Sequence, residues 1–291
     1  MSVHEHSLAK RCLAEVIGTF ILVFFGCGAV HAAVLTGAQS GVWQVAIVWG
    51  VAIVAAAYVV GGISGAHINP SITIALATWG RFSWPQVAHY VVSQVAGAFL
   101  AAAVLFAVYG PFLAEKECEK HVTRGEQGSE VTAMCYGEYY PSPGSDATAR
   151  LFIEGNATRL AELAPTWSAF GIEVLGTALL ALVVFATTDE RNLPRPISQL
   201  APVFIGLTVA ILISVIAPLT QACFNPARDF GPRLLAFLAG WGRVAIPGPN
   251  GSGFFTVYIL APVLGALVGG GLYARLLHPA LPADAKEQAR Y

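Results

Sequence analysis

The chain has 291 residues, of which 56% are hydrophobic and only 11% are charged, and its formal net charge is −1. Because soluble domains carry about 25% charged residues, this composition excludes an ordinary soluble domain and indicates that lipid is the solvent. The nearly neutral net charge gives no reason to expect a nucleic-acid partner.

Six apolar segments are long enough to cross a bilayer as helices, since about 20 residues span its hydrocarbon core. They are residues 12–35, 42–62, 86–112, 167–188, 198–219 and 254–277. Lys10 and Arg11 precede the first segment, and the short even-to-odd connections hold Arg81, Arg191 and Arg195. By the positive-inside rule we expect both termini in the cytoplasm. We expect a multi-pass protein of the plasma membrane, or of the inner membrane if the source is bacterial.

The two halves of the chain repeat each other. Residues 14–19 are similar to residues 172–177, and residues 94–98 are similar to residues 262–266. Since each half holds three spans, the second half enters the membrane from the opposite side, which makes the repeat inverted. The sequence thus predicts an all-α membrane protein with one channel domain over residues 1–291. Its parts are repeat 1 at 8–112, an extracellular or periplasmic insert at 113–166, repeat 2 at 167–278 and a cytoplasmic tail at 279–291.

The 113–166 insert is the one soluble-looking part of the chain, rich in Glu, Lys, Gly, Ser and Tyr. It either caps the outer mouth of the protein or lies in solvent. Cys118 and Cys135 both belong to it, and they are either two free thiols or a disulfide formed in an oxidising compartment.

Each half also contains an Asn-Pro pair, which is a compact helix-start signal. Asn favours the N-cap, and Pro favours the first helical position. The two motifs are Asn69-Pro70-Ser71 and Asn225-Pro226-Ala227. The segments that follow, residues 70–79 and 226–239, are too short to cross a bilayer. In an inverted repeat they would enter from opposite faces as half-helices and meet by their N-termini near the midplane.

Two opposed helix N-termini create a positive electrostatic maximum, which hinders cations and protons but not neutral solutes. The side-chain amides of Asn69 and Asn225 can donate to a passing oxygen. The preceding loop carbonyls supply acceptors, and they belong to Gly65, Ala66, His67, Ala222, Cys223 and Phe224. Arg228 opposes the helix dipole in the first turn of the second half-helix, so we expect it to line a pore.

The other polar residues at membrane depth have competing interpretations. Glu15 and Glu173 occupy matched positions, which favours a scaffold role as acceptors for the re-entrant loops over proton coupling. His67 is expected to brace its loop. Asp229 and Arg233 lie four residues apart and are expected to form a solvated ion pair. Because no nucleophile–base set or metal-ligand cluster is present, we expect no enzyme activity, no metal and no cofactor.

These motifs carry a family resemblance over nearly the whole chain. Residues 64–70, residues 225–228, the repeated Glu-x-x-Gly-Thr and the six-span inverted repeat resemble the aquaporin superfamily, the major intrinsic proteins. Ser71 departs from the usual Asn-Pro-Ala of that family. The resemblance implies a right-handed helical bundle and a homotetramer with one pore in each subunit. Asp229, Arg233 and Pro262 are similar to its glycerol-conducting branch.

The resemblance also places the outer selectivity filter on Trp49, Ile213, Ala222 and Arg228. Water channels usually have His at the Ile213 position, so an aliphatic residue there implies a wider filter with an apolar wall. Typical bacterial glycerol facilitators have Gly and Phe at the Ile213 and Ala222 positions. The set is more similar to that of plant nodulin-like intrinsic proteins, which pass glycerol, small amides and some metalloid acids. We therefore expect a passive channel for glycerol, water and other small uncharged solutes that excludes ions and protons. The alternatives are a mainly water-selective channel, a metalloid acid or hydrogen peroxide channel, and a proton-coupled transporter.

Overall fold

The structure is a computed structural model that describes residues 6–39 and 41–282. Its described residues form helices and loops without any strand. Six helical segments are long and apolar enough to cross a membrane, which confirms the predicted number of spans. They cover Leu8–Thr36, Val42–Ser64, Trp84–Glu119, Ala157–Thr187, Ile197–Thr220 and Gly253–Ala280.

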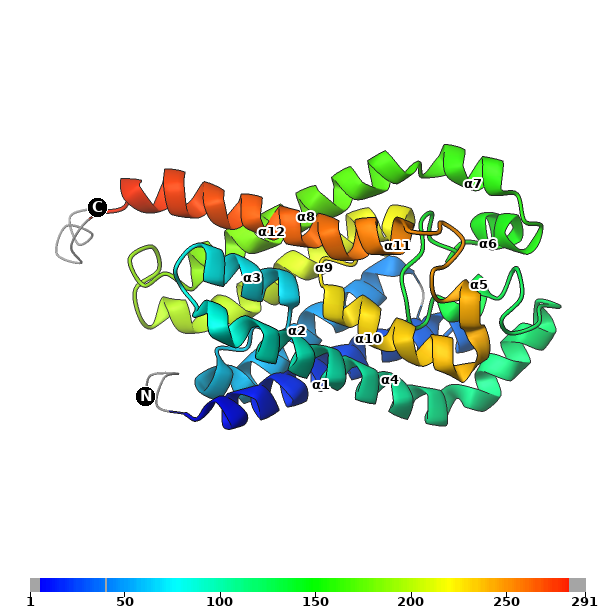
Figure 1. Cartoon of the computed structure of the whole chain (residues 1–291), viewed down its shortest axis with the longest axis horizontal. Helices are drawn as coiled ribbons and strands as arrows, with labels where there is room; N and C mark the ends of the chain where they lie inside the picture. The colour runs from blue at the N-terminus through cyan, green and yellow to red at the C-terminus, as the bar shows by residue number, and fades with distance from the viewer. Residues whose placement is uncertain (1–5, 40, 283–291) are drawn as a thin grey trace.

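The spans are built from one or several helical pieces each. The main helices are α1 (Leu8–His31), α2 (Val42–Ser64), α4 (Trp84–Glu119), α8 (Thr166–Thr187), α9 (Ala201–Thr220) and α12 (Ala261–Leu272). Shorter pieces extend them, namely η2 (Ala32–Thr36), η3 (Ile197–Leu200), α11 (Gly253–Phe255), η6 (Thr256–Leu260), η7 (Tyr273–Leu277) and η8 (His278–Ala280). The start of α1 and the end of the last span lie at the same end of the molecule (Figure 1).

Two half-helices follow the Asn-Pro pairs, as predicted. They are α3 (Pro70–Thr78) and α10 (Pro226–Ala236), and α10 continues through η4 (Phe237–Trp241) and η5 (Gly242–Val244). Both begin on an Asn N-cap in extended conformation, with Pro as the first helical residue. The Asn69 side chain accepts from the Ser71 N–H at 2.9 Å, and the Asn225 side chain accepts from the Ala227 N–H at 3.0 Å. The helix-start interpretation of both motifs is therefore confirmed.

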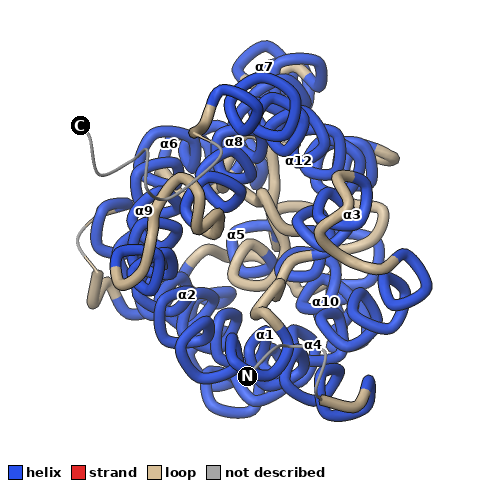
Figure 2. Tube along the Cα trace, turned by 90° about the vertical axis from the view of Figure 1, so that its left-hand side faces the viewer, coloured by secondary structure: helices blue, strands red, loops and turns tan. Residues whose placement is uncertain are grey.

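The half-helices exchange partners between the repeats. The first-repeat half-helix α3 packs on α12 of the second repeat, and α10 of the second repeat packs on α4 of the first. Viewed along the helices, the spans surround a centre that contains the loops leading to α3 and α10 (Figure 2). This reciprocal packing ties the two repeats together and is the arrangement that an inverted repeat requires.

Matched glycines set close helix contacts in both repeats. A Cβ on Gly97 of α4 would lie 2.3 Å from the Val16 carbonyl oxygen of α1, and one on Gly265 of α12 would lie 2.3 Å from the Val174 oxygen of α8. Both glycines belong to the repeated motif at 94–98 and 262–266. Small residues allow membrane helices to approach backbone to backbone, so the repeat conserves a packing contact within this one chain.

The outward faces of the helices are apolar. Exposed side chains include Val51, Val59, Val92, Val108 and Val215, which are 59–69% exposed. A water-soluble monomer rarely exposes apolar surface of this extent, whereas lipid covers it without cost. The chain is therefore a multi-pass membrane protein.

The insert differs from its predicted outline in two ways. Helix α4 continues to Glu119, beyond the predicted boundary at 112, and α8 already begins at Thr166. The insert carries three short helices, α5 (Glu130–Ala133), α6 (Asp146–Ile153) and α7 (Ala157–Leu163). Residues 129–140 are all buried, so of the two alternatives for the insert, the one that leaves it in solvent does not hold for its central part. The apolar and aromatic side chains there pack against α4 and the segment after α10.

The two insert cysteines are free thiols in the structure. Cys118 is exposed and Cys135 is buried, and neither forms a disulfide. Burial raises the pKa of the Cys135 thiol, which therefore stays protonated at neutral pH. Of the predicted tail at 279–291, only the part up to residue 282 lies within the described residues.

Candidate solute-conducting site

The two Asn-Pro loops meet and hold each other at the centre of the protein. The Asn69 amide nitrogen donates to the Phe224 carbonyl at 2.9 Å, and the Asn225 amide nitrogen donates to the Ile68 carbonyl at 2.8 Å. Each Asn thus caps its own half-helix with its oxygen and braces the opposite loop with its nitrogen. Because an amide nitrogen carries two hydrogens, each Asn keeps one donor beyond this contact.

The loops before the half-helices have an unusual backbone. Ala66, Ile68, Ala222 and Phe224 have φ angles of 49°, 42°, 58° and 52°, in the left-handed region that non-glycine residues rarely occupy. Such strain persists only where the surrounding structure enforces it, and it is concentrated at functional sites. The Phe224 carbonyl, which the sequence predicts to accept from a solute, accepts from the Asn69 amide in this structure and so links the two loops.

Glu15 supports the first loop through hydrogen bonds to its backbone. Its carboxylate accepts from the backbone N–H groups of His67 at 3.0 Å and Ile68 at 2.7 Å. It also accepts from the Ser64 hydroxyl at 2.7 Å and from the Gln94 amide at 2.7 Å. The side chain is fully buried. Glu15 therefore makes the loop contacts that the scaffold interpretation expects.

Glu173 makes the matching contacts in the second repeat. It accepts from the backbone N–H groups of Cys223 at 2.9 Å and Phe224 at 3.0 Å, and from the Thr220 hydroxyl at 2.6 Å. It is also fully buried. Neither Glu173 nor Glu15 is among the residues that line the two central cavities described next. Both carboxylates thus face the loop backbone and not the solute path.

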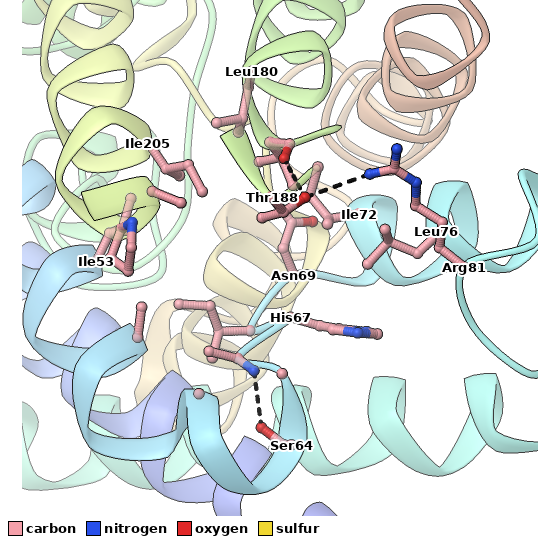
Figure 3. A pocket seen from close by; sticks show the side chains of 18 of the residues that line it. Ile53, Ser64, His67, Asn69, Ile72, Leu76, Arg81, Leu180, Thr188 and Ile205 are labelled. Atoms are coloured by element: carbon pink, nitrogen blue, oxygen red, sulfur yellow. Dashed lines mark hydrogen bonds between the residues drawn. The ribbon is translucent and has the colours of Figure 1, made fainter. Parts of the chain in front are cut away.

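An inner cavity of about 640 Å³ leads to both Asn side chains. It is lined by apolar side chains, several of which Figure 3 shows around Asn69, and by the loop residues Gly65, Ala66 and His67. The His67 ring packs against Phe82 and Tyr90, with ring centroids 4.6 Å and 4.9 Å away. Its Nδ1 atom lies 3.2 Å from the Thr73 hydroxyl. These contacts fix the ring at the cavity wall, as expected of a loop brace.

An outer cavity of about 380 Å³ brings together three of the four predicted filter residues, Trp49, Ile213 and Arg228. The Arg228 guanidinium carbon lies 4.1 Å from the centroid of the Trp49 ring, a cation–π geometry. The fourth, Ala222, is buried and is not among the lining residues, whereas its neighbour Gln221 is. The cavity therefore has an aromatic and aliphatic wall beside one guanidinium.

The two cavities approach each other along the first turn of α10. The inner cavity ends at Asn225 and the outer cavity at Arg228, three residues further on. We infer that the two cavities are the halves of one solute path, which passes the opposed N-termini of α3 and α10. The walls are mostly apolar. Their polar groups include the two Asn amides, loop backbone and Arg228, together with the charged side chains Arg11, Arg81, Asp189 and Glu190 of the inner cavity. Near the opposed N-termini the path therefore suits small uncharged molecules with hydroxyl groups.

The Asp229–Arg233 pair forms with a separation of 2.8 Å, but the expectation that it is solvated is wrong. The side chains are 0% and 1% exposed. They are covered because Arg233 donates to the Ala245 carbonyl at 2.8 Å and also to the Glu138 carbonyl of the insert. Reasoning from helix spacing could find the pair but not the loops that bury it.

Sequence analysis missed two polar residues of the site. Glu138 of the insert forms an ion pair with Arg228 and lies 90 positions before it in the chain, with no motif to connect them. Gln94 supports Glu15, and it stands in a repeated motif that could have drawn attention to it. Its counterpart in the second repeat is Pro262, which cannot donate a hydrogen bond, so comparison of the two repeats does not indicate a polar role at this position.

The fold and this path define a membrane channel built from an inverted six-span repeat. The sequence model of the family described as major intrinsic protein matches residues 2–273, so the chain belongs to that family.

Individual relatives agree with this assignment. The chain is 41% identical to a glycerol uptake facilitator protein of Pseudomonas aeruginosa over 96% of its length and 92% of the relative. It is 38% identical to the glycerol uptake facilitator protein of Escherichia coli K12 with the same coverage. It is also 38% identical to a propanediol uptake facilitator of Citrobacter freundii, over 96% of each chain. The solved aquaglyceroporin from Plasmodium falciparum shares its fold, with a TM-score of 0.75 at 24% identity over 94% of this chain and 98% of that one.

Proposed function

We propose that this protein is a passive channel for glycerol, water and other small uncharged solutes. The observation that carries the proposal is the outer cavity, in which Trp49 and Ile213 form an apolar wall beside the donors of Arg228. A polyol has a carbon backbone on one side and hydroxyls on the other. Its carbon backbone can contact the apolar wall while its hydroxyls accept from Arg228. The names of the relatives, glycerol and propanediol uptake facilitators, support the same substrate class.

Charged species are excluded by the centre of the path. The N-termini of α3 and α10 oppose cations and protons there, and Arg228 adds one positive group in the outer cavity. Glu15 and Glu173 are bonded to loop backbone, which supports their scaffold role and argues against a proton-coupled transporter. The pore residues of the proposal are Asn69, Asn225, Trp49, Ile213 and Arg228, with Ala222 as the small neighbour that leaves the filter wide.

A permeability panel in liposomes tests the proposal. The purified protein is reconstituted, and swelling is followed by light scattering for water, glycerol, urea and arsenite. We expect both water and glycerol to enter faster than in protein-free vesicles. Acceleration of water alone would overturn the glycerol assignment and leave a water-selective channel, whereas arsenite faster than glycerol would favour a metalloid channel.

We further propose that both termini face the cytoplasm and that the protein assembles as a homotetramer in the plasma membrane. The arginine-bearing connections support the orientation by the positive-inside rule, and family membership supports the assembly. Cys118 is an exposed thiol on the proposed outer side. A membrane-impermeant maleimide should label it in intact cells but not in a Cys118→Ser variant, and the mass of the detergent-solubilised complex reports the subunit number.

A further inference from the structure

Glu138 lies beside the filter because its backbone is fixed there. Its N–H donates to the Asp229 carboxylate at 2.8 Å, and its carbonyl accepts from the Arg233 guanidinium. Since the Asp229–Arg233 pair is almost completely buried, these two bonds attach the insert firmly to α10. The attachment point is next to Arg228 in the sequence, so the insert reaches the filter at one defined place.

The Glu138 side chain then pairs with the filter arginine. The two side chains form an ion pair in which Glu138 is 3% exposed and Arg228 is 6% exposed. A guanidinium buried to this extent needs a counter-charge, because burying an unpaired charge is very costly. Arg228 lines the outer cavity, whereas Glu138 is not among the lining residues. The carboxylate therefore lies behind the guanidinium, which has the Trp49 ring on another side.

We propose that Glu138 is a positioning residue that sets the solute specificity of the filter by holding the Arg228 guanidinium in place. This inference rests on the proposed glycerol channel. The ion pair holds the guanidinium from the side away from the cavity, so that its five donors keep a fixed orientation. A polyol bonds through several hydroxyls and needs donors in fixed positions, whereas water has a single oxygen and tolerates displacement. Loss of the Glu138 charge should therefore affect glycerol more than water.

The test compares the ratio of glycerol to water permeability among variants in liposomes. Glu138→Gln keeps the side-chain size and removes the charge, and we expect the ratio to fall by at least about threefold, since hydrogen bonds to charged groups are among the stronger ones. Glu138→Asp keeps the charge and should recover part of the ratio. Glu130→Gln is the matched control, because Glu130 is a buried carboxylate of the same insert that accepts from the Gly128 N–H at 2.8 Å. It should keep the wild-type ratio.

A second background separates positioning from a merely structural role. In an Arg228→Gln background, the further change Glu138→Gln should leave the ratio unaltered, because the two residues act as one unit. If Glu138→Gln alone folds poorly, the double variant removes the unpaired buried charge and should recover the yield. A wild-type ratio in Glu138→Gln, the same ratio change in the Arg228→Gln background, or an unrecovered yield would overturn the inference. Glycerol conduction by the wild-type protein in the same vesicles reports on the proposed function separately.

Discussion

At the scale of single residues, the proposed filter has an aliphatic side chain at position 213 and a small one at position 222. Ile213 and Arg228 both line the outer cavity, and the Ile213 side chain offers no hydrogen bond, while Ala222 is buried and does not line the cavity. A polyol can be excluded from such a site by size alone, whereas water cannot. The selectivity of the channel should therefore respond to the volume and polarity of the residue at position 213.

Replacing Ile213 with His should narrow the filter and add a donor. We expect glycerol permeability to fall about tenfold more than water permeability, which is within the usual range for steric discrimination in a pocket. The Ile213→Val variant keeps an aliphatic wall and should retain the wild-type ratio. Equal losses of glycerol and water flux in Ile213→His would contradict the assignment of Ile213 to the filter.

Each re-entrant loop depends on one carboxylate for the support of its backbone, Glu15 for the first loop and Glu173 for the second. Glu15→Ala would leave the His67 and Ile68 N–H groups without their acceptor in a buried site. Because an unsatisfied buried donor costs about 1–3 kcal/mol, we expect a clearly lower midpoint of thermal unfolding in detergent. The measurement is unfolding monitored by intrinsic fluorescence.

The matched control for that variant is Glu119→Ala. The Glu119 side chain is 55% exposed and pairs with Lys116 at the surface, where such pairs contribute little to stability. Its unfolding midpoint should stay close to that of the wild-type protein. If Glu15→Ala is as stable as Glu119→Ala, the carboxylate is not a support for the loop.

At the scale of elements, the repeat is held together by helix crossings that leave no room for side chains. Gly97 places α4 directly on the backbone of α1, and Gly265 does the same for α12 on α8. These contacts position the half-helices, because α4 and α12 are the helices on which α10 and α3 pack. A change at either crossing should therefore reach the filter.

Gly97→Ala should destabilise the fold by about 1–3 kcal/mol, the usual cost of overpacking. The added methyl group would lie 2.3 Å from the Val16 carbonyl oxygen, and backbone cannot move aside as a side chain can. Gly110→Ala in the same helix is the control, since a Cβ there meets nothing within 4 Å. Unfolding in detergent measures both, and equal stability of the two variants would show that the α1–α4 crossing is looser than the structure indicates.

Much of this architecture could be predicted from the sequence. Apolar length predicts each span, and the Asn-Pro pairs predict α3 and α10, because N-capping and the fixed φ of Pro are local effects. The predicted boundary at residue 112 is too early, because residues 115–119 are mostly charged and yet continue the helix to Glu119. Polarity marks where lipid ends, and a helix can extend beyond that point.

The parts of the site that could not be predicted depend on long-range contacts. The pairing of Glu138 with Arg228 and the burial of Asp229 and Arg233 both result from the path of the insert, for which no local pattern exists. Trp49 and Ile213 could be placed only through spacing and family resemblance, and the structure brings both to the outer cavity. Tertiary contacts of this kind are outside the reach of periodicity.

At the scale of the whole molecule, the proposed solute path consists of the two cavities and the half-helix N-termini between them. The two cavities lead to the opposed half-helices from either end, and neither Glu15 nor Glu173 lines them. The carboxylates that do line the inner cavity, Asp189 and Glu190, are paired with Arg81 and Arg195. A path of this kind conducts down a gradient without coupling to protons. Transport by such a channel should depend on the solute gradient alone.

The concentration and pH dependence of glycerol flux in proteoliposomes therefore tests the central claim most directly. We expect the initial flux to rise linearly with the glycerol gradient and to stay unchanged when a pH gradient is imposed across the membrane. Early saturation of the flux, or uphill accumulation of glycerol driven by the pH gradient, would contradict the passive channel and support a proton-coupled carrier.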